Sequence, residues 1–130
     1  MATTLDRETL ASLPASYFDA VDRQDLDDVV RHFADDATLT VQTDHVTFTG
    51  RDEIRRMFSD FFESSSSIFH ELKNIVVEEA RGKVATEQSY IGTLTDGTKN
   101  DMHNCNFFDV NDDGTFDRVI IWMAGTNPLK

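Results

Sequence analysis

The sequence predicts an α+β fold in which three N-terminal helices pack on one face of a strongly curved, mostly antiparallel sheet. In the first half of the chain, segments with apolar residues at three- and four-residue steps are typical of amphipathic helices. Beyond residue 67 the apolar period changes to two and stays there, as in consecutive strands. With 130 residues and no internal repeat, the chain is large enough for one core, so residues 1–130 are expected to form a single domain.

Three helices are expected. The first carries Pro14 inside its apolar pattern, so we expect a kink there or a new start capped by Ser12. Asp25 is the expected N-cap of a short second helix, and the third helix spans about 51–63. The inward residues of the first helix are Leu10, Leu13, Tyr17 and Val21.

Six strands are expected after and between these helices. Segments 37–42 and 46–50 alternate and are rich in β-branched residues, and Gly50 ends the second of them. The serine run at 64–67 is interpreted as a loop. Turn signals then separate four long strands, which span roughly 67–79, 82–95, 100–110 and 116–125.

The composition excludes several classes of function. A formal net charge of −12 leaves no basic surface for nucleic acid. No run approaches the roughly 18 apolar residues of a membrane span, and the polar, acidic N-terminus is unlike a secretory signal, which indicates a cytoplasmic protein. Cys105 is the single cysteine, which excludes an intrachain disulfide and a multi-cysteine metal site; we expect a packed thiol.

The segment 118–123, RVIIWM, is apolar on both alternating faces. A strand covered on one side only should alternate with polar residues, so a second layer is expected on its outer face. Since the helices cover the other face, we expect a homodimer that pairs through the outer face of the sheet. A terminal segment that folds back would cover that face equally well.

The loop DVNDDG at 109–114 matches the opening of a calcium-binding loop. That motif needs a bidentate glutamate at its twelfth position, which is Ile120 here. A hairpin turn in which Gly114 adopts a positive φ is the favoured interpretation. The chain shows neither the histidine and carboxylate spacing of a metal site nor a glycine-rich phosphate loop, so we expect no metal and no cofactor.

His70 lies in the segment IFHELKN and is the main candidate for chemistry. A carboxylate that accepts its Nδ1 hydrogen would fix the tautomer and leave Nε2 free as a base. Without such a partner, a packed histidine bonded to a main-chain carbonyl is the plainer interpretation. Alternation along a strand places four further side chains on the expected cavity side with His70, namely Ile68, Leu72, Asn74 and Val76.

The order of elements, together with FADDATL at 33–39 and TGRDEIRRMF at 49–58, resembles the SnoaL-like branch of the nuclear transport factor 2-like superfamily. The resemblance extends over nearly the whole chain and implies a cone-shaped α+β barrel around a deep, mostly apolar pocket. Enzymes of this group include ketosteroid isomerase, scytalone dehydratase, polyketide cyclases, limonene epoxide hydrolase and hexachlorocyclohexane dehydrochlorinase, whereas other members are transport or association domains. The fold by itself therefore assigns no reaction.

The resemblance also implies roles for individual residues. In the dehydrochlorinase and dehydratase group an aspartate at the end of the first helix orients a catalytic histidine, and the matching residues are Asp22 and His70. Tyr17 matches the oxyanion-hole tyrosine of ketosteroid isomerase, and Asn104 stands where that enzyme has its second donor. The base aspartate of the isomerase falls near Val41, so the sequence departs from the isomerase mechanism at its base. The alternative for Tyr17 is a core aromatic residue.

Strand 100–110 is expected to turn Asn104 toward the pocket, by the same comparison. His103 and Cys105 then point away, and His103 would be a second base only with the opposite facing. On strand 82–95 the sequence does not decide which side faces the pocket: the side of Glu87, or the side of Gln88 and Tyr90. The expected substrate-binding residues are Leu72, Asn74, Val76, Met102, Asn106, Phe108, Val119 and Met123; His32 and His45 are expected at the surface.

The favoured hypothesis is a cofactor-independent enzyme that acts on a small, apolar steroid-, terpenoid- or polyketide-like molecule. His70 would remove a proton with Asp22 orienting its ring, while Tyr17 and Asn104 hold a developing oxyanion. Isomerisation or elimination is the favoured reaction type, and cyclisation is a further possibility. Two alternatives stay open: a non-catalytic small-molecule-binding or association module of the same fold, and an epoxide- or ester-type hydrolase in which His70 activates water.

Overall fold

Within residues 5–124, which the computed structural model describes, six strands form one sheet in the order β2-β1-β6-β5-β4-β3. Neighbouring strands are antiparallel except β1 and β6, which run parallel. The helices are α1 (Arg7–Asp22), α2 (Leu26–Val30) and α3 (Gly50–Glu63). The strands are β1 (Phe33–Val41), β2 (Val46–Thr49), β3 (Ser65–Glu78), β4 (Lys83–Leu94), β5 (Lys99–Val110) and β6 (Phe116–Trp122).

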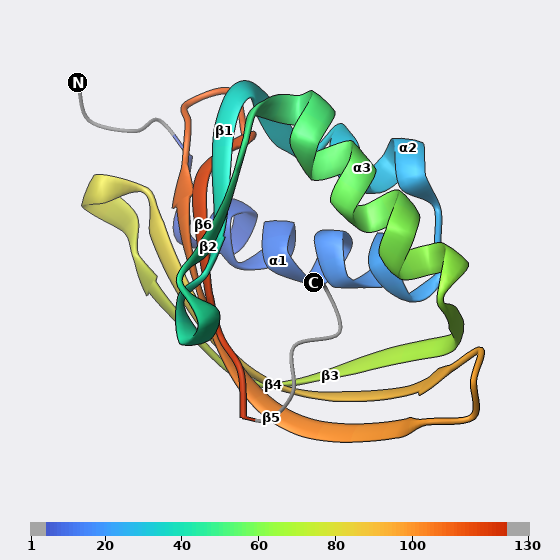
Figure 1. Cartoon of the computed structure of the whole chain (residues 1–130). Helices are drawn as coiled ribbons and strands as arrows, with labels where there is room; N and C mark the ends of the chain where they lie inside the picture. The colour runs from blue at the N-terminus through green and yellow to red at the C-terminus, as the bar shows by residue number, and fades with distance from the viewer. Residues whose placement is uncertain (1–4, 125–130) are drawn as a thin grey trace.

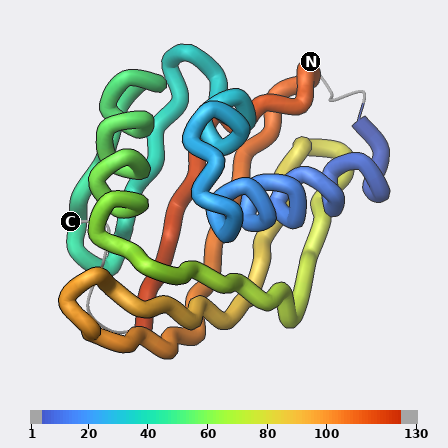
Figure 2. Tube along the Cα trace, turned by 90° about the vertical axis from the view of Figure 1, so that its right-hand side faces the viewer, coloured from blue at the N-terminus to red at the C-terminus, as the bar shows by residue number. Residues whose placement is uncertain are grey.

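The sheet is strongly bent and its two edge strands, β2 and β3, do not meet, so the predicted α+β class is confirmed with an open cone (Figure 1). The helices lie on the concave side of the bend. Helix α3 packs against β1, whereas α1 packs against β3 at the other end of the sheet (Figure 2). The space that these elements enclose is where the candidate site lies.

Helix α1 is one continuous helix that begins at Arg7. The side chain of Asp6 caps it, since its Oδ1 accepts the backbone N–H of Thr9 at 2.8 Å. Pro14 lies inside without ending it, because a proline removes one backbone hydrogen bond and the buried face of the helix is held by tertiary packing. The predicted new start at Ser12 is therefore wrong. The predicted cap of α2 is confirmed, because Asp25 Oδ1 accepts the N–H of Asp28.

The serine run belongs to β3 rather than to a loop. Ser64 ends α3, and Ser65 already pairs with Leu94 of β4. Ser66 and Ser67 are exposed positions of an edge strand, where polar side chains are tolerated. Gly50 has a φ of 84° and begins α3 rather than ending the strand before it.

Helix α1 runs along the free edge of β3, and side chains at its two ends each bond one backbone group of that edge. At one end, the guanidinium of Arg7 donates to the carbonyl of Val77 at 3.3 Å. At the other end, the carboxylate of Asp22 accepts the backbone N–H of His70 at 2.9 Å. Because an edge strand has no neighbour for these groups, α1 takes the place of a further strand.

The core lies between α1, α3 and the bent sheet and is rich in aromatic side chains. Tyr17 is at its centre, with ring centroids of Phe33 and Phe116 each 5.8 Å away in edge-to-face contacts. Phe108 and Val119, predicted to line the pocket, are fully buried in this core. The prediction placed both residues on the correct face of the sheet, but they belong to the core and not to the pocket lining.

The loop at residues 111–114 is the predicted hairpin turn. Gly114 has a φ of 87°, and its N–H donates to the carbonyl of Asn111 at 2.9 Å. The carboxylate of Asp113 accepts the backbone N–H of Thr115 at 2.9 Å, so it stabilises the turn itself. No helix in the described part of the chain is long and apolar enough to cross a membrane.

Candidate active site

Asp22 and His70 are in direct contact. His70 is on β3 and Asp22 is the last residue of α1; its Oδ1 lies 2.6 Å from His70 Nδ1 and its Oδ2 accepts the His70 backbone N–H. The two side chains are 12% and 20% exposed for His70 and Asp22, respectively. A carboxylate at Nδ1 holds a hydrogen on that nitrogen, so the unprotonated Nε2 of neutral His70 is available as a base.

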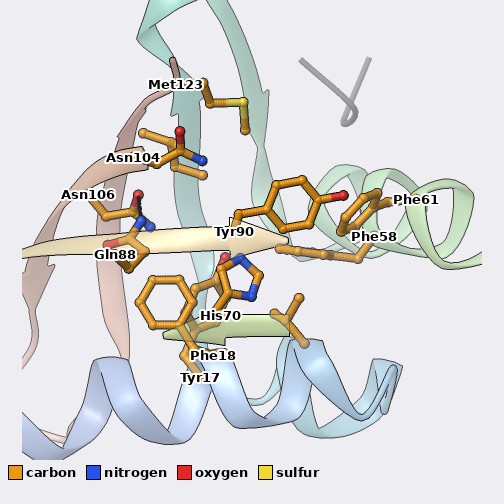
Figure 3. Close-up of a pocket in the computed structure, with 12 residues that line it drawn as sticks. Tyr17, Phe18, Phe58, Phe61, His70, Gln88, Tyr90, Asn104, Asn106 and Met123 are labelled. Atoms are coloured by element: carbon orange, nitrogen blue, oxygen red, sulfur yellow. Dashed lines mark hydrogen bonds between the residues drawn. The ribbon is translucent and has the colours of Figure 1, made fainter. Parts of the chain in front are cut away.

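The imidazole of His70 lies between two aromatic rings. Phe18 stacks on it with a centroid distance of 4.8 Å, and Tyr90 lies 5.3 Å away. These rings and the bond to Asp22 restrict the ring to one orientation, which faces the pocket (Figure 3). The site therefore presents an oriented, partly desolvated imidazole to whatever enters.

The pocket is a small hollow of about 40 Å³ that is partly open to the surface. Its floor comes from α1 and α3, and its walls come from the inner faces of β3, β4, β5 and β6. Most of its surface is apolar, so the few polar groups stand out as the sites of specific contact. The lining residues are Tyr17, Phe18, Val21, Phe58, Phe61, His70, Gln88, Tyr90, Asn104, Asn106, Ile121 and Met123.

Three amide side chains form a polar wall in this hollow. Asn104 accepts the backbone N–H of Ala124 on its Oδ1 at 3.0 Å. Gln88 donates from Nε2 to Asn106 Oδ1 at 3.0 Å, and Thr86 donates its hydroxyl to Gln88 Oε1 at 2.8 Å. Each of these four side chains is buried.

Two tyrosines complete the site. Burial raises the pKa of Tyr17, and the nearby Asp22 carboxylate adds to the effect, so its phenol stays protonated at neutral pH and can donate. Tyr90 lies over Gly92, two residues along β4. A Cβ at Gly92 would stand 2.4 Å from the Tyr90 hydroxyl oxygen, so the missing side chain is what makes room for the ring.

The family follows from a comparison with known domains. A family model described as a SnoaL-like domain matches residues 15–119. The chain belongs to the SnoaL-like family. No curated protein matches the chain.

Solved structures share the fold of this SnoaL-like domain. A proposed aromatic ring hydroxylase from Novosphingobium aromaticivorans is 25% identical, with a TM-score of 0.85 and 96% of each chain covered. The epoxide hydrolase/cyclase-like enzyme SalBIII, which takes part in pyran ring formation in the polyether salinomycin, is 20% identical, with a TM-score of 0.82 over 92% of this chain and 93% of that one. A proposed ketosteroid isomerase from Kribbella flavida is 18% identical, with a TM-score of 0.73 over 92% and 81%.

The structure of the SnoaL-like domain brings several predicted site residues together. His70, Tyr17 and Asn104 line one pocket, with Asp22 behind the imidazole. Of the expected substrate-binding residues, Asn106 and Met123 also line it. Leu72 and Met102 do not; they pack against the core beside it.

A β-bulge at Lys73 changes the facing of β3. Between Leu72 and Asn74 the pairing advances two residues on β3 and one on β4. Asn74 and Val76 therefore point to the outer face, where Asn74 donates to Glu87 and Val76 is 66% exposed. The prediction that these two residues line the pocket is wrong, because strict alternation does not hold across an extra residue.

Sequence reasoning missed most of the apolar lining and left Gln88 and Tyr90 undecided. Both are buried on the inner face of β4, while Glu87 faces outward. The signal was present in the alternation itself, since Val84 shares a face with Gln88 and Tyr90 and an apolar side chain marks the inner side.

The remaining histidines and the cysteine lie away from the pocket. His103 and Cys105 are on the outer face; Glu87 contacts His103 there, and Cys105 is exposed, so the predicted packed thiol is wrong. His45 is exposed as expected. His32 is buried, contrary to the prediction: its Nε2 lies 2.9 Å from the Ser16 hydroxyl and its Nδ1 lies 2.6 Å from the carbonyl of Asp28.

Proposed function

We propose that this SnoaL-like domain is a cofactor-independent acid–base enzyme in which His70 removes a proton from a small, largely apolar molecule. The observation that carries the proposal is the 2.6 Å contact between Asp22 Oδ1 and His70 Nδ1, with the imidazole facing the pocket. Asp22 holds the neutral ring in the tautomer whose Nε2 accepts a proton and stabilises the imidazolium that forms.

The charge that develops on the substrate is held by donors elsewhere in the pocket. Tyr17, whose pKa is raised by burial, offers a phenolic hydrogen. Asn104 accepts from a backbone N–H on its oxygen, so its amide hydrogens are available to an oxyanion. Proton removal beside a carbonyl or a leaving group then leads to isomerisation or elimination, and an attack within the same molecule leads to cyclisation.

The size and lining of the pocket limit which substrate can bind. Aromatic and aliphatic side chains surround the imidazole, which suits an apolar skeleton of terpenoid or polyketide type. A hollow of about 40 Å³ cannot enclose an intact steroid, so a substrate would place only one end in it and extend through its open side.

The proposal is tested by proton exchange in deuterated water. A panel of small cyclic ketones is incubated with the chain, and deuterium incorporation beside the carbonyl is followed by mass spectrometry. Exchange above the buffer rate is expected for the native chain, and His70→Ala should abolish it with an unchanged unfolding curve. Exchange that survives His70→Ala would refute a role of His70 as the base, and product formation with labelled oxygen from water would indicate hydrolysis instead.

We also infer that the chain associates as a homodimer through the outer face of the sheet. Large apolar side chains stand about half exposed there, among them Phe69, Ile91, Phe107 and Trp122. A second copy of the chain would remove them from water.

A further inference from the structure

The amide of Asn104 has one defined orientation. The atom opposite its Oδ1 is the backbone nitrogen of Ala124, 3.0 Å away, and a backbone N–H can only donate. The oxygen of Asn104 is therefore bound to the chain, and its Nδ2 turns toward the pocket that the residue lines. No second hydrogen bond to the side chain of Asn104 is found within residues 5–124.

Asn106, two residues along β5, takes its orientation from a neighbouring strand. Its Oδ1 accepts Gln88 Nε2 at 3.0 Å (Figure 3). Gln88 Oε1 in turn accepts the hydroxyl of Thr86 at 2.8 Å. The three side chains are 2%, 1% and 3% exposed for Asn106, Gln88 and Thr86, respectively, so water does not compete with this chain of bonds.

The direction of these hydrogen bonds, from Thr86 through Gln88 to Asn106, follows from the hydroxyl group of Thr86. Among the described residues, Thr86 Oγ1 bonds to no polar side chain besides Gln88. If the amides were turned round, Thr86 would accept from Gln88 and its own buried hydrogen would be left without an acceptor. With Thr86 as the donor, Gln88 must donate to Asn106, and the amide hydrogens of Asn106 are left for the pocket.

We propose that Gln88 is a positioning residue that, together with Thr86, turns the amide of Asn106 so that Asn104 and Asn106 both present N–H donors to the substrate. The substrate therefore carries a carbonyl oxygen, which binds this amide wall while its neighbouring carbon faces His70. This inference rests on the proposed function for the role of His70, but the polarity of the wall can be measured without any turnover.

Two aromatic probes of similar size measure that polarity. Acetophenone carries a carbonyl oxygen and ethylbenzene does not, and their dissociation constants are obtained by NMR titration of the ¹⁵N-labelled chain. The ratio of the two constants is compared between variants, so that the general hydrophobic part of binding cancels. In the native chain the side-chain amide resonances of Asn104 and Asn106 should shift further with acetophenone, which bonds them, than with ethylbenzene, which acts on them only through its ring.

Gln88→Glu is the decisive variant. An ionised carboxylate at this position accepts from Thr86 but cannot donate, so Asn106 must turn its amide hydrogens toward it and its oxygen toward the pocket. At a pH at which the introduced carboxyl group is ionised, which its ¹³C chemical shift reports, the preference for acetophenone should fall about tenfold, the equivalent of one hydrogen bond. As the pH falls and the introduced carboxyl group takes up a proton, it can donate again and the native preference should return. The native chain, with the same Asp22 and His70, controls for every other titration.

A preference for acetophenone that is the same in Gln88→Glu whether the introduced carboxyl group is protonated or ionised would overturn the proposal. A parallel loss of ethylbenzene binding would do so as well, since it would show that Gln88 merely supports the fold. If Gln88→Glu does not fold, Thr86→Val and Thr86→Ser take its place: the preference should fall in the first, which lacks the donor, and persist in the second. Equal ratios in these two variants would count against the inference.

The outcome is separable from that of the proposed enzyme activity. His70→Ala should keep the preference for acetophenone, because the wall and not the imidazole recognises the oxygen. If proton exchange survives in His70→Ala while Gln88→Glu loses the preference for acetophenone, His70 is not the base but the proposed orientation of the amide wall holds. If exchange is lost in His70→Ala while Gln88→Glu keeps the preference, the proposed orientation of the wall is refuted and His70 remains the base.

Discussion

Asp22 holds His70 through two hydrogen bonds, one from each carboxylate oxygen, to the ring Nδ1 at 2.6 Å and to the backbone nitrogen at 2.9 Å. The backbone bond fixes the strand against the end of α1, and the ring bond fixes the tautomer of the imidazole. One side chain therefore determines both where the imidazole of His70 lies and which of its ring nitrogens is free.

Asp22→Asn should reverse the tautomer of His70. The amide oxygen can still accept the backbone N–H, but the amide nitrogen then faces Nδ1, which must become an acceptor and pass its hydrogen to Nε2. We expect a loss of turnover of about 10²- to 10⁴-fold with the fold retained. The imidazole ¹⁵N shifts report the tautomer directly, and Asp19→Asn on the exposed side of α1 is the control. An unchanged tautomer would show that Asp22 does not set it.

Stability should fall on acidification partly through His32. Burial lowers the pKa of His32 below its ordinary value of about 6.5. Between the two values the unfolded chain binds a proton that the folded chain resists, so stability decreases as the pH falls below about 6.5 and stops decreasing at the lower, folded pKa. Urea unfolding at pH 7.5 and 5.5 should show a smaller pH dependence for His32→Gln than for the native chain. The exposed His45→Gln is the control; equal slopes for His32→Gln and the native chain would contradict the prediction.

Gly92→Ala should displace Tyr90 from the pocket wall. The added Cβ would meet the hydroxyl oxygen of Tyr90 at 2.4 Å, so the ring or the strand must move. We expect a loss of about 1–3 kcal/mol in the free energy of unfolding, typical of overpacking. A double-mutant cycle measures the cause: in a Tyr90→Leu background the same substitution should cost much less. An equal cost in both backgrounds would assign the effect to the backbone of β4.

The homodimer proposal predicts that Trp122→Lys dissociates the chain. Trp122 is 49% exposed on the outer face, next to Cys105 of β5 in the register. A charge there would have to be buried against the second copy, which is costly. Sedimentation equilibrium should give a dimer for the native chain and a monomer for the variant, and Thr47→Lys on β2 should leave the dimer intact. A native chain that sediments as a monomer at tens of micromolar would refute the proposal.

Most of the fold could be predicted from the change of apolar period and the turn signals, because these reflect which side of each element faces the core. The contact between Asp22 and His70 could be predicted too, since the resemblance supplied the pair and alternation gave the facing of His70. The alternation of inward and outward side chains along β3 holds from His70 to Leu72 and ends at the bulge that follows.

The errors have local physical causes that residue patterns do not carry. One extra residue, Lys73, turns Asn74 and Val76 to the opposite face of the sheet. The types of the side chains around it do not predict a bulge. Pro14 costs one backbone hydrogen bond, which the packing of α1 outweighs. His32 is hydrophilic by type but finds two hydrogen-bond partners inside, which makes its burial tolerable.

The alignment of α1 along β3 has a consequence beyond the candidate site. An uncovered strand of 14 residues would offer its backbone as a template to any other extended chain, and such strands are common starting points for aggregation. Arg7, Gln24 and Asp22 occupy that border with their own side chains. The carboxylate that bonds the imidazole of His70 therefore also occupies part of the edge at which another extended chain could add.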